Sequence, residues 1–179
     1  MSIVIPVKPK PTAAESLQKR GALFISSTPE QRADWLDRTP WGVKLAWAEE
    51  CEISLYMRGY HLPNGCALFR EGDHDAFCAI VISGGLEILK GDLAEQQRVV
   101  AHLGVGKMVG EMSLLDGGSR SATAVAIEET DLLVLTREDF DRMSERHPQV
   151  ALRFAVMIAE AIANLLRQTT GALVEHLHP

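Results

Sequence analysis

The stretch from about residue 52 to residue 136 is divided into short segments by turn residues. Apolar and polar residues alternate within these segments, as in Leu86–Lys90 and Thr123–Ile127. A period of two is that of a strand with one buried face. The turns are marked by Gly65, Gly72, Gly84, Gly104, Gly106 and Gly110. Many short strands with a turn signal about every 8 to 12 residues predict an all-β sandwich or barrel.

Helical patterns precede this stretch. An amphipathic helix is expected from about Ala13 to Phe24, and a third one from Val43 to about Cys51. Between them, a helix begins with Thr28 as its N-cap and Pro29 at its first position. A threonine oxygen satisfies free N–H groups there, and the fixed backbone of proline suits the first turn. We therefore predict that residues 1–50 form an N-terminal arm and helices, ahead of a β-barrel over residues 51–136.

Two further helices follow the predicted strands and make up a C-terminal part, residues 137–179. Thr136 caps a helix that ends near His147, and Pro148 begins a long helix that continues to about His176. One stripe of the long helix is made by Leu152, Val156, Ala159, Ala163, Leu166, Thr170 and Leu173. Its spacing fits docking onto the protein's own barrel, as a lid, and equally a seam between two parallel copies.

The segment from Gly110 to Thr123 reads GEMSLLDGGSRSAT. Gly110 lets the backbone approach a ligand without a Cβ atom in the way. Free N–H groups after Glu111 favour negative charge, and the guanidinium of Arg120 matches a phosphate. The Glu111 carboxylate only accepts hydrogen bonds, so it suits hydroxyl groups. The segment predicts a site for a phosphate with a hydroxyl nearby. The alternative is that Glu111 and Arg120 pair with each other at a sheet edge.

This segment resembles the phosphate-binding cassette of the cyclic nucleotide-binding domain family. The resemblance rests on Gly110-Glu111-Met112-Ser113-Leu114 and Arg120-Ser121-Ala122-Thr123, with Met112 in place of the usual leucine. It implies a double-stranded β-helix, or jelly-roll, barrel over about residues 50 to 140. It also implies that Glu111 holds the ribose 2′-hydroxyl and that Arg120 holds the cyclic phosphate. The N–H groups that would complete the phosphate cradle are those of Ser113, Ser121 and Ala122.

The same resemblance places the base of the nucleotide against apolar strand residues. By position these are Ile88, Val100, Leu103 and Val109, which fit equally well as ordinary core. Ser121 can donate or accept a hydrogen bond, and in the family a hydroxyl at this position serves either nucleotide. We expect cyclic AMP rather than cyclic GMP as the ligand.

In the family, the last helix covers the base and passes the binding event to a DNA-binding domain, a kinase or a channel. The covering positions would fall near Leu165 and Leu166, which carry no hydroxyl, so Arg167, Thr169 and Thr170 are substitutes to test. The chain is therefore predicted to be a stand-alone regulatory sensor that signals through its C-terminal helix to a second copy or to an unknown partner protein. The alternative is a scaffold or interaction module that keeps the barrel without ligand dependence.

Composition argues against some classes of partner and indicates the compartment. A net charge of −6 argues against a nucleic-acid partner, which needs a concentrated basic face. No apolar run approaches the roughly 20 residues that cross a bilayer, so no membrane is expected. The three cysteines, Cys51, Cys66 and Cys78, stand in apolar surroundings and are typical of buried free thiols in a reducing compartment, and we expect a cytoplasmic protein.

Enzyme functions find little support in the sequence. Cupin enzymes share this type of barrel but need paired histidines and a carboxylate as metal ligands, whereas His74 and His102 are isolated. No Ser/His/Asp or Cys/His arrangement is indicated either. We expect no catalytic residues, no metal and no cofactor besides the cyclic nucleotide ligand.

Overall fold

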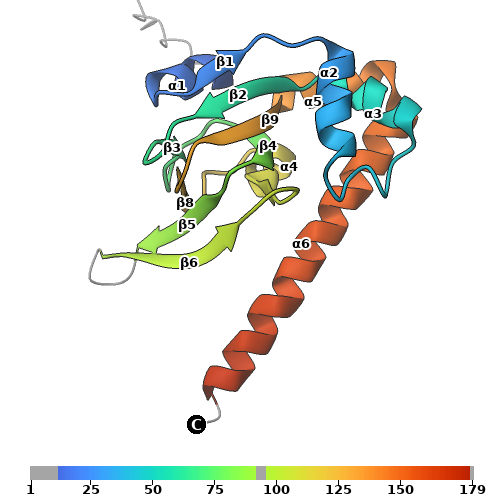
Figure 1. The fold of residues 1–179 in the computed structure, drawn as a ribbon. Helices are drawn as coiled ribbons and strands as arrows, with labels where there is room; N and C mark the ends of the chain where they lie inside the picture. Colours follow the sequence, from blue (N-terminus) through green and yellow to red (C-terminus); the bar gives the residue numbers. More distant parts are fainter. Residues whose placement is uncertain (1–11, 92–95, 178–179) are drawn as a thin grey trace, which may run out of the picture.

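The computed structural model describes residues 12–91 and 96–177, which form two antiparallel β-sheets with helices around them (Figure 1). The first sheet has the order β1 (Leu23–Ile25), β2 (Arg58–Leu62), β9 (Thr130–Thr136), β4 (Phe77–Ser83) and β7 (Met108–Val109). The second has the order β3 (Ala67–Phe69), β8 (Thr123–Ala126), β5 (Leu86–Gly91) and β6 (Gln97–Leu103). The predicted jelly-roll barrel with flanking helices is confirmed.

Strand β4 shows how the core is divided. Its residues from Phe77 to Val81 are all buried, as expected for a strand that is covered on both faces. Phe77, Ala79 and Val81 point into the cluster between the two sheets. Cys78 and Ile80 point the other way, into a cluster formed with the helices. The barrel therefore has an apolar interior and a second apolar layer outside it.

The N-terminal helices are α1 (Ala13–Lys19), α2 (Pro29–Asp37) and α3 (Trp47–Ser54). The predicted cap of α2 by Thr28 is confirmed. The helix predicted over Ala13–Phe24 is too long. It ends at Lys19, Gly21 then turns the chain with a φ of 94°, and the next residues form β1 against β2. Residues 1–11, most of the predicted arm, lie outside the described residues.

The helix predicted over Val43–Cys51 begins later, at Trp47. The preceding residues form turns, because Trp41 is drawn into the core and donates from Nε1 to the carbonyl oxygen of Gly106, at 2.9 Å. The first turn of α3 is instead fixed by the Glu49 carboxylate, which accepts from the N–H of Ala46 at 2.8 Å. A long-range contact thus overrides the local helical pattern.

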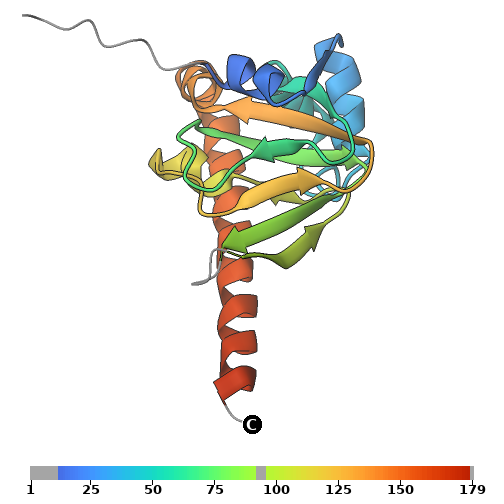
Figure 2. The same ribbon diagram turned by 90° about the vertical axis from the view of Figure 1, so that its left-hand side faces the viewer.

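The remaining helices are α4 (Glu111–Asp116), α5 (Arg137–Arg146) and α6 (Pro148–Leu177). The positions of α5 and α6 and the Thr136 cap agree with the sequence prediction. The first part of α6 packs beside α3 and α5, whereas its C-terminal part projects beyond the sheets in both views (Figures 1 and 2).

The buried face of α6 is not the predicted stripe. Val150, Phe154, Met157 and Ile158 carry the helix onto the core. The residues of the predicted stripe are exposed or half-buried, with Leu152 at 67% and Leu166 at 66% exposure. Docking of this stripe onto the protein's own barrel is therefore wrong. The last member, Leu173, lies beyond the side chains that the structure describes.

One helix among the described residues, α6 over Pro148–Gly171, is long and apolar enough to cross a membrane, with a mean hydropathy of 1.5. The sequence prediction of no such run overlooked it, because charges such as Arg153 and Glu160 interrupt the run without making it polar on average. Length and composition are weak evidence for a span, since helices in the core of soluble domains share them.

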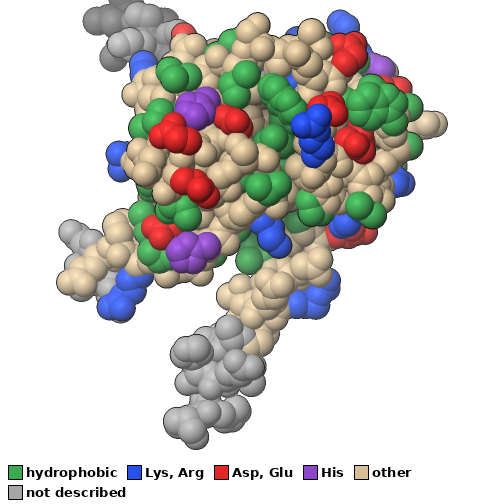
Figure 3. All heavy atoms as spheres, in the orientation of Figure 1, with side chains coloured by type: hydrophobic (Ala, Val, Ile, Leu, Met, Phe, Trp, Pro, Cys, Tyr) green, Lys and Arg blue, Asp and Glu red, His purple; other side chains and the backbone are tan. Residues whose placement is uncertain are grey.

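The surface and the cysteines add two observations. On the face shown in Figure 3, acidic and basic side chains are interspersed. The three cysteines are free thiols, as predicted. Cys78 is buried, and loss of solvation raises the pKa of its thiol to about 12. Cys51 and Cys66 are partly exposed, so the predicted burial of all three thiols is wrong for these two.

Candidate functional site

A groove of about 860 Å³ runs between the second sheet, the segment around α4 and the middle of α6. The structure brings all eleven predicted site residues to its wall. These are Gly110, Glu111, Met112, Ser113, Arg120, Ser121, Ala122, Ile88, Val100, Leu103 and Val109. Residues that are up to 34 positions apart in the sequence are brought together because β5 and β6 pair with each other and β5 pairs with β8.

Gly110 is fixed by its surroundings. Its φ of 80° lies in the left-handed region, which residues with a side chain rarely adopt. A Cβ atom here would lie 2.3 Å from Nη1 of Arg120 and 2.8 Å from the carbonyl oxygen of Phe77. The glycine predicted for close approach to a ligand is thus required first for close approach of Arg120.

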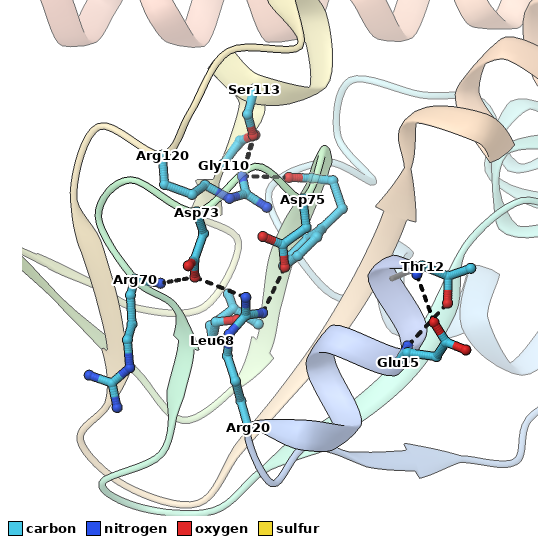
Figure 4. A network of polar contacts seen from close by, with 11 residues as sticks. Thr12, Glu15, Arg20, Leu68, Arg70, Asp73, Asp75, Gly110, Ser113 and Arg120 are labelled. Carbon is cyan, nitrogen blue, oxygen red and sulfur yellow. Dashed lines mark hydrogen bonds and ion pairs between the residues drawn. The ribbon is translucent and has the colours of Figure 1, made fainter. Parts of the chain in front are cut away.

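Arg120 is the most buried charged group of the groove, with 3% exposure. Its Nη1 donates to the carbonyl oxygens of Phe77 at 2.8 Å and Gly110 at 3.0 Å, and also to Oγ of Ser113 (Figure 4). Its guanidinium carbon lies 4.0 Å from the ring centre of Phe69 and 4.2 Å from that of Phe77. The side chain is therefore held by the protein through one nitrogen and two aromatic faces.

The other nitrogens of Arg120 are not held in this way. Nε and Nη2 are buried and have no hydrogen-bond partner among the described residues. Loss of solvation lowers the pKa of the guanidinium to about 10, so it keeps its charge at neutral pH. Buried donors of a charged group are costly when unpaired. The arrangement is one that an anion would complete, because a phosphate accepts from two nitrogens of one guanidinium.

Glu111 lies at the start of α4 and is half-buried. Loss of solvation raises the pKa of its carboxyl group, and the positive charge of Arg120 opposes that rise. The hydrogen bonds of Arg120 go to other groups, and no ion pair joins these two side chains. The alternative in which Glu111 and Arg120 merely pair with each other is therefore wrong.

The sequence reasoning missed Lys90, which fixes one wall of the groove. Its Nζ donates to the carbonyl oxygen of Ser121 at 2.6 Å and to Oε1 of Glu71 at 2.5 Å. The backbone of the predicted cradle is thereby tied to β5. Alternation within β5 places Lys90 on the same face as Leu86 and Ile88, but nothing local indicates its partner 31 residues later.

Helix α6 forms one wall of the groove, and this wall includes Leu165 and Thr169 of the predicted capping positions. Leu166, Arg167 and Thr170 are not among the lining residues. The wall also includes the amide side chains of Asn164 and Gln168, which the sequence reasoning did not single out. Amides both donate and accept, so this face can hydrogen-bond the edge of a base.

Comparison with known proteins identifies a matching family model and two relatives that are similar to this chain. A family model described as "Cyclic nucleotide-binding domain" matches residues 60–147. The cyclic AMP receptor protein of Thermus thermophilus is 41% identical over 115 residues, which are 64% of this chain and 53% of the receptor. The lysophospholipase nte1 of Neurospora crassa is 31% identical over 60% of this chain and only 7% of that protein.

Among solved structures, a cyclic nucleotide-binding domain from Methylobacillus flagellatus superposes with a TM-score of 0.76. The match covers 87% of this chain and 89% of that one at 22% identity, and it supports the fold alone. The chain thus spans about half the length of the receptor and a small part of the phospholipase. The region that the family model matches contains β3 to β9 and the segment from Gly110 to Thr123.

Proposed function

Since the chain belongs to the cyclic nucleotide-binding domain family, we propose that it is a regulatory protein that binds a cyclic nucleotide in the groove beneath α6. The observation that supports this most is the state of Arg120. It is a buried, charged side chain on the groove wall, and two of its nitrogens lack hydrogen-bond partners among the described residues. A cyclic phosphate would supply acceptors for both nitrogens.

Binding requires a small rearrangement of Arg120. Its Nε and Nη2 are covered by protein atoms, and Phe69 and Phe77 hold the guanidinium from two sides. We propose that the phosphate draws the side chain toward the groove, while the N–H groups of Ser113, Ser121 and Ala122 complete the cradle. The carboxylate of Glu111 then accepts from the ribose hydroxyl.

We propose cyclic AMP as the ligand in preference to cyclic GMP. One relative, that of Thermus thermophilus, is by name a cyclic AMP receptor protein, and the hydroxyl of Ser121 is compatible with this choice. The base would lie along Ile88, Val100, Leu103 and Val109, and Gly110 and Met112 would contribute to the same wall. Asn164 and Gln168 of α6 are the groups that can read its polar edge.

The output is proposed to come from α6. Its middle lines the groove, and its predicted stripe is exposed, so ligand binding can bias both the position of α6 and its pairing with a second copy. We propose a cytoplasmic homodimer or a complex with another protein, without a nucleic-acid or membrane partner and without a chemical step. Sedimentation with and without ligand tests the self-association.

Thermal unfolding tests the binding itself. The full chain is heated with increasing cyclic AMP, cyclic GMP or inorganic phosphate. A ligand that binds only the native state raises the midpoint in proportion to the logarithm of its concentration above Kd. We expect the largest rise with cyclic AMP and a smaller one with cyclic GMP. A midpoint that none of the three compounds moves would contradict the proposal.

One observation favours a second function, a scaffold module without ligand dependence. Nη1 of Arg120 already donates hydrogen bonds to the carbonyl oxygens of Phe77 and Gly110 and to Oγ of Ser113, so the guanidinium has a structural role of its own. In that case Arg120 would stabilise the loop and no nucleotide would bind. The heating experiment separates the two functions, because a scaffold predicts no midpoint shift.

A further inference from the structure

Arg20, at the C-terminal end of α1, reaches across to the loop between β3 and β4. Its Nη2 lies 2.9 Å from Oδ2 of Asp73, and its Nη1 lies 2.7 Å from Oδ2 of Asp75 (Figure 4). Nη1 also donates to the carbonyl oxygen of Leu68 at 3.2 Å. The side chain of Arg20 is 18% exposed and that of Asp75 only 7%. These are partly buried pairs, which solvent screens less than surface pairs.

The same loop is bonded to Arg120. The N–H of Arg120 donates to the carbonyl oxygen of Asp73 at 2.8 Å, and the N–H of Gly72 donates to the carbonyl oxygen of Arg120 at 2.9 Å. The carboxylate of Asp73 also accepts from the N–H of Arg70 at 2.7 Å. The loop is therefore bonded to Arg120 on one side and to Arg20 on the other, with its two carboxylates between these arginines (Figure 4).

The negative charges of Asp73 and Asp75 oppose the binding of an anion at Arg120. Among the charges that act on the guanidinium of Arg120, that of Asp75 is the strongest, and it raises the pKa of Arg120, whereas Arg20 lowers it. A free Asp75 would be an acceptor for the unpaired nitrogens of Arg120 and would compete with a phosphate. In the structure its Oδ2 is occupied by Arg20 instead.

We propose that Arg20 is a positioning residue for the anion site: by holding Asp73 and Asp75, it keeps these carboxylates off the guanidinium of Arg120 and leaves its charge for a ligand. This inference rests on the proposed function and extends it to the N-terminal helix, far from the groove in sequence. It makes α1 part of the binding apparatus.

The test compares three variants of the full chain by calorimetry with cyclic AMP. Arg20→Gln is expected to weaken binding about three- to tenfold, the usual range for residues that act on a site through others. Arg38→Gln removes an exposed arginine that pairs with Asp34 on α2, and it should leave affinity unchanged. Arg20→Gln combined with Asp75→Asn should recover most of the loss, because the competing charge is gone.

Recovery of affinity by Asp75→Asn distinguishes a role of Arg20 in holding the carboxylates from a role in fastening α1 to the loop. If Arg20 only fastened α1 to the loop, the second substitution would not restore that fastening, and the affinity would stay low. Loss without recovery, or no loss in Arg20→Gln, would overturn the proposal.

A ligand-free readout keeps the inference distinct from the proposed function. In Arg20→Gln, the Nε–H resonance of Arg120 should move as Asp75 turns to it, and the double variant should return it to its place. If the resonance moves and returns in this way but cyclic AMP does not bind to the wild type, the proposed function is rejected and the role of Arg20 is supported. An unmoved resonance would overturn that role.

Discussion

Arg120 and Glu50 are both buried charged residues with polar atoms that lack hydrogen-bond partners among the described residues, but their surroundings differ. Arg120 lies on the wall of the groove between two phenyl rings. Glu50 lies on α3 among the packed helices, with 0% exposure and both carboxylate oxygens unpaired, and it does not line the groove.

The free-energy cost of an unpaired buried charge can be relieved in different ways at Glu50 and at Arg120. Loss of solvation raises the pKa of Glu50, and the nearby charges of Asp37 and Glu49 raise it further, so a proton can neutralise this group. Arg120, with a pKa of about 10, stays charged at neutral pH and needs an anion. An unpaired buried charge therefore points to a ligand when it lies on a groove and cannot be neutralised.

The largest expected effect concerns the residue that supports Arg120. Gly110→Ala places a Cβ atom against Arg120 and Phe77 in a left-handed conformation. Strain and overpacking together should lower the free energy of unfolding by about 2–5 kcal/mol. Gly117→Ala is the matched control, because Gly117 has a φ of 68° with nothing within 4 Å. Urea unfolding of both variants measures the difference, and equal losses would show that Arg120 is not crowded by Gly110.

Arg120→Gln should weaken the binding of cyclic AMP tenfold to a hundredfold, since a charge-assisted hydrogen bond contributes about 1.5–3 kcal/mol. Calorimetry of wild type and variant measures this. Glu50→Gln is the comparison, since it also removes a buried charge but lies away from the groove, and it should leave affinity unchanged. Equal affinities of wild type and Arg120→Gln would show that Arg120, like Glu50, does not contribute to binding.

Glu50→Gln should raise the free energy of unfolding at neutral pH by about 1 kcal/mol or more, because the amide removes the charge, and an unpaired buried charge costs more than the roughly 1–3 kcal/mol of a neutral group. The folded pKa of Glu50 is raised above its unfolded value, so this group's contribution is fully present at acid pH and is lost as pH rises through the folded pKa. The variant should therefore also flatten the pH dependence of stability. Glu52→Gln, on the same helix with a partly exposed pair to His147, serves as the control and should change little.

The smallest effect is expected for Glu111→Gln. The amide keeps one acceptor for the ribose hydroxyl and loses only the charge, so binding of cyclic AMP should weaken about three- to tenfold, or roughly 0.5–1.5 kcal/mol. The 2′-deoxy analogue provides the check, because without the hydroxyl it should bind wild type and variant equally. A loss of the same size for the analogue would show that Glu111 acts elsewhere.

The sequence predicted the parts of this fold that are encoded locally. The alternating strands, the Thr28 and Thr136 caps and the segment from Gly110 to Thr123 each carry their pattern within a few residues. Strand β1 was missed because three residues show no period, and its partner β2 lies 34 or more positions away. The turns around Trp41 depend in the same way on Gly106.

The missed parts of the candidate site are also long-range. Arg20 meets Asp73 across 53 positions, and Lys90 meets Ser121 across 31. No spacing rule within one element connects such residues, so only the folded chain reveals them. The burial of Arg120 between Phe69 and Phe77 likewise follows from the pairing of strands and not from the motif.

The central claim is that the unpaired nitrogens of Arg120 take the phosphate. It is tested most directly by following the Nε–H and Nη resonances of Arg120 in the labelled full chain as cyclic AMP is added. We predict a saturable shift of the Nε–H signal with the same Kd that calorimetry gives. Saturation of the protein with these signals unmoved, or no binding of cyclic AMP, would contradict the account.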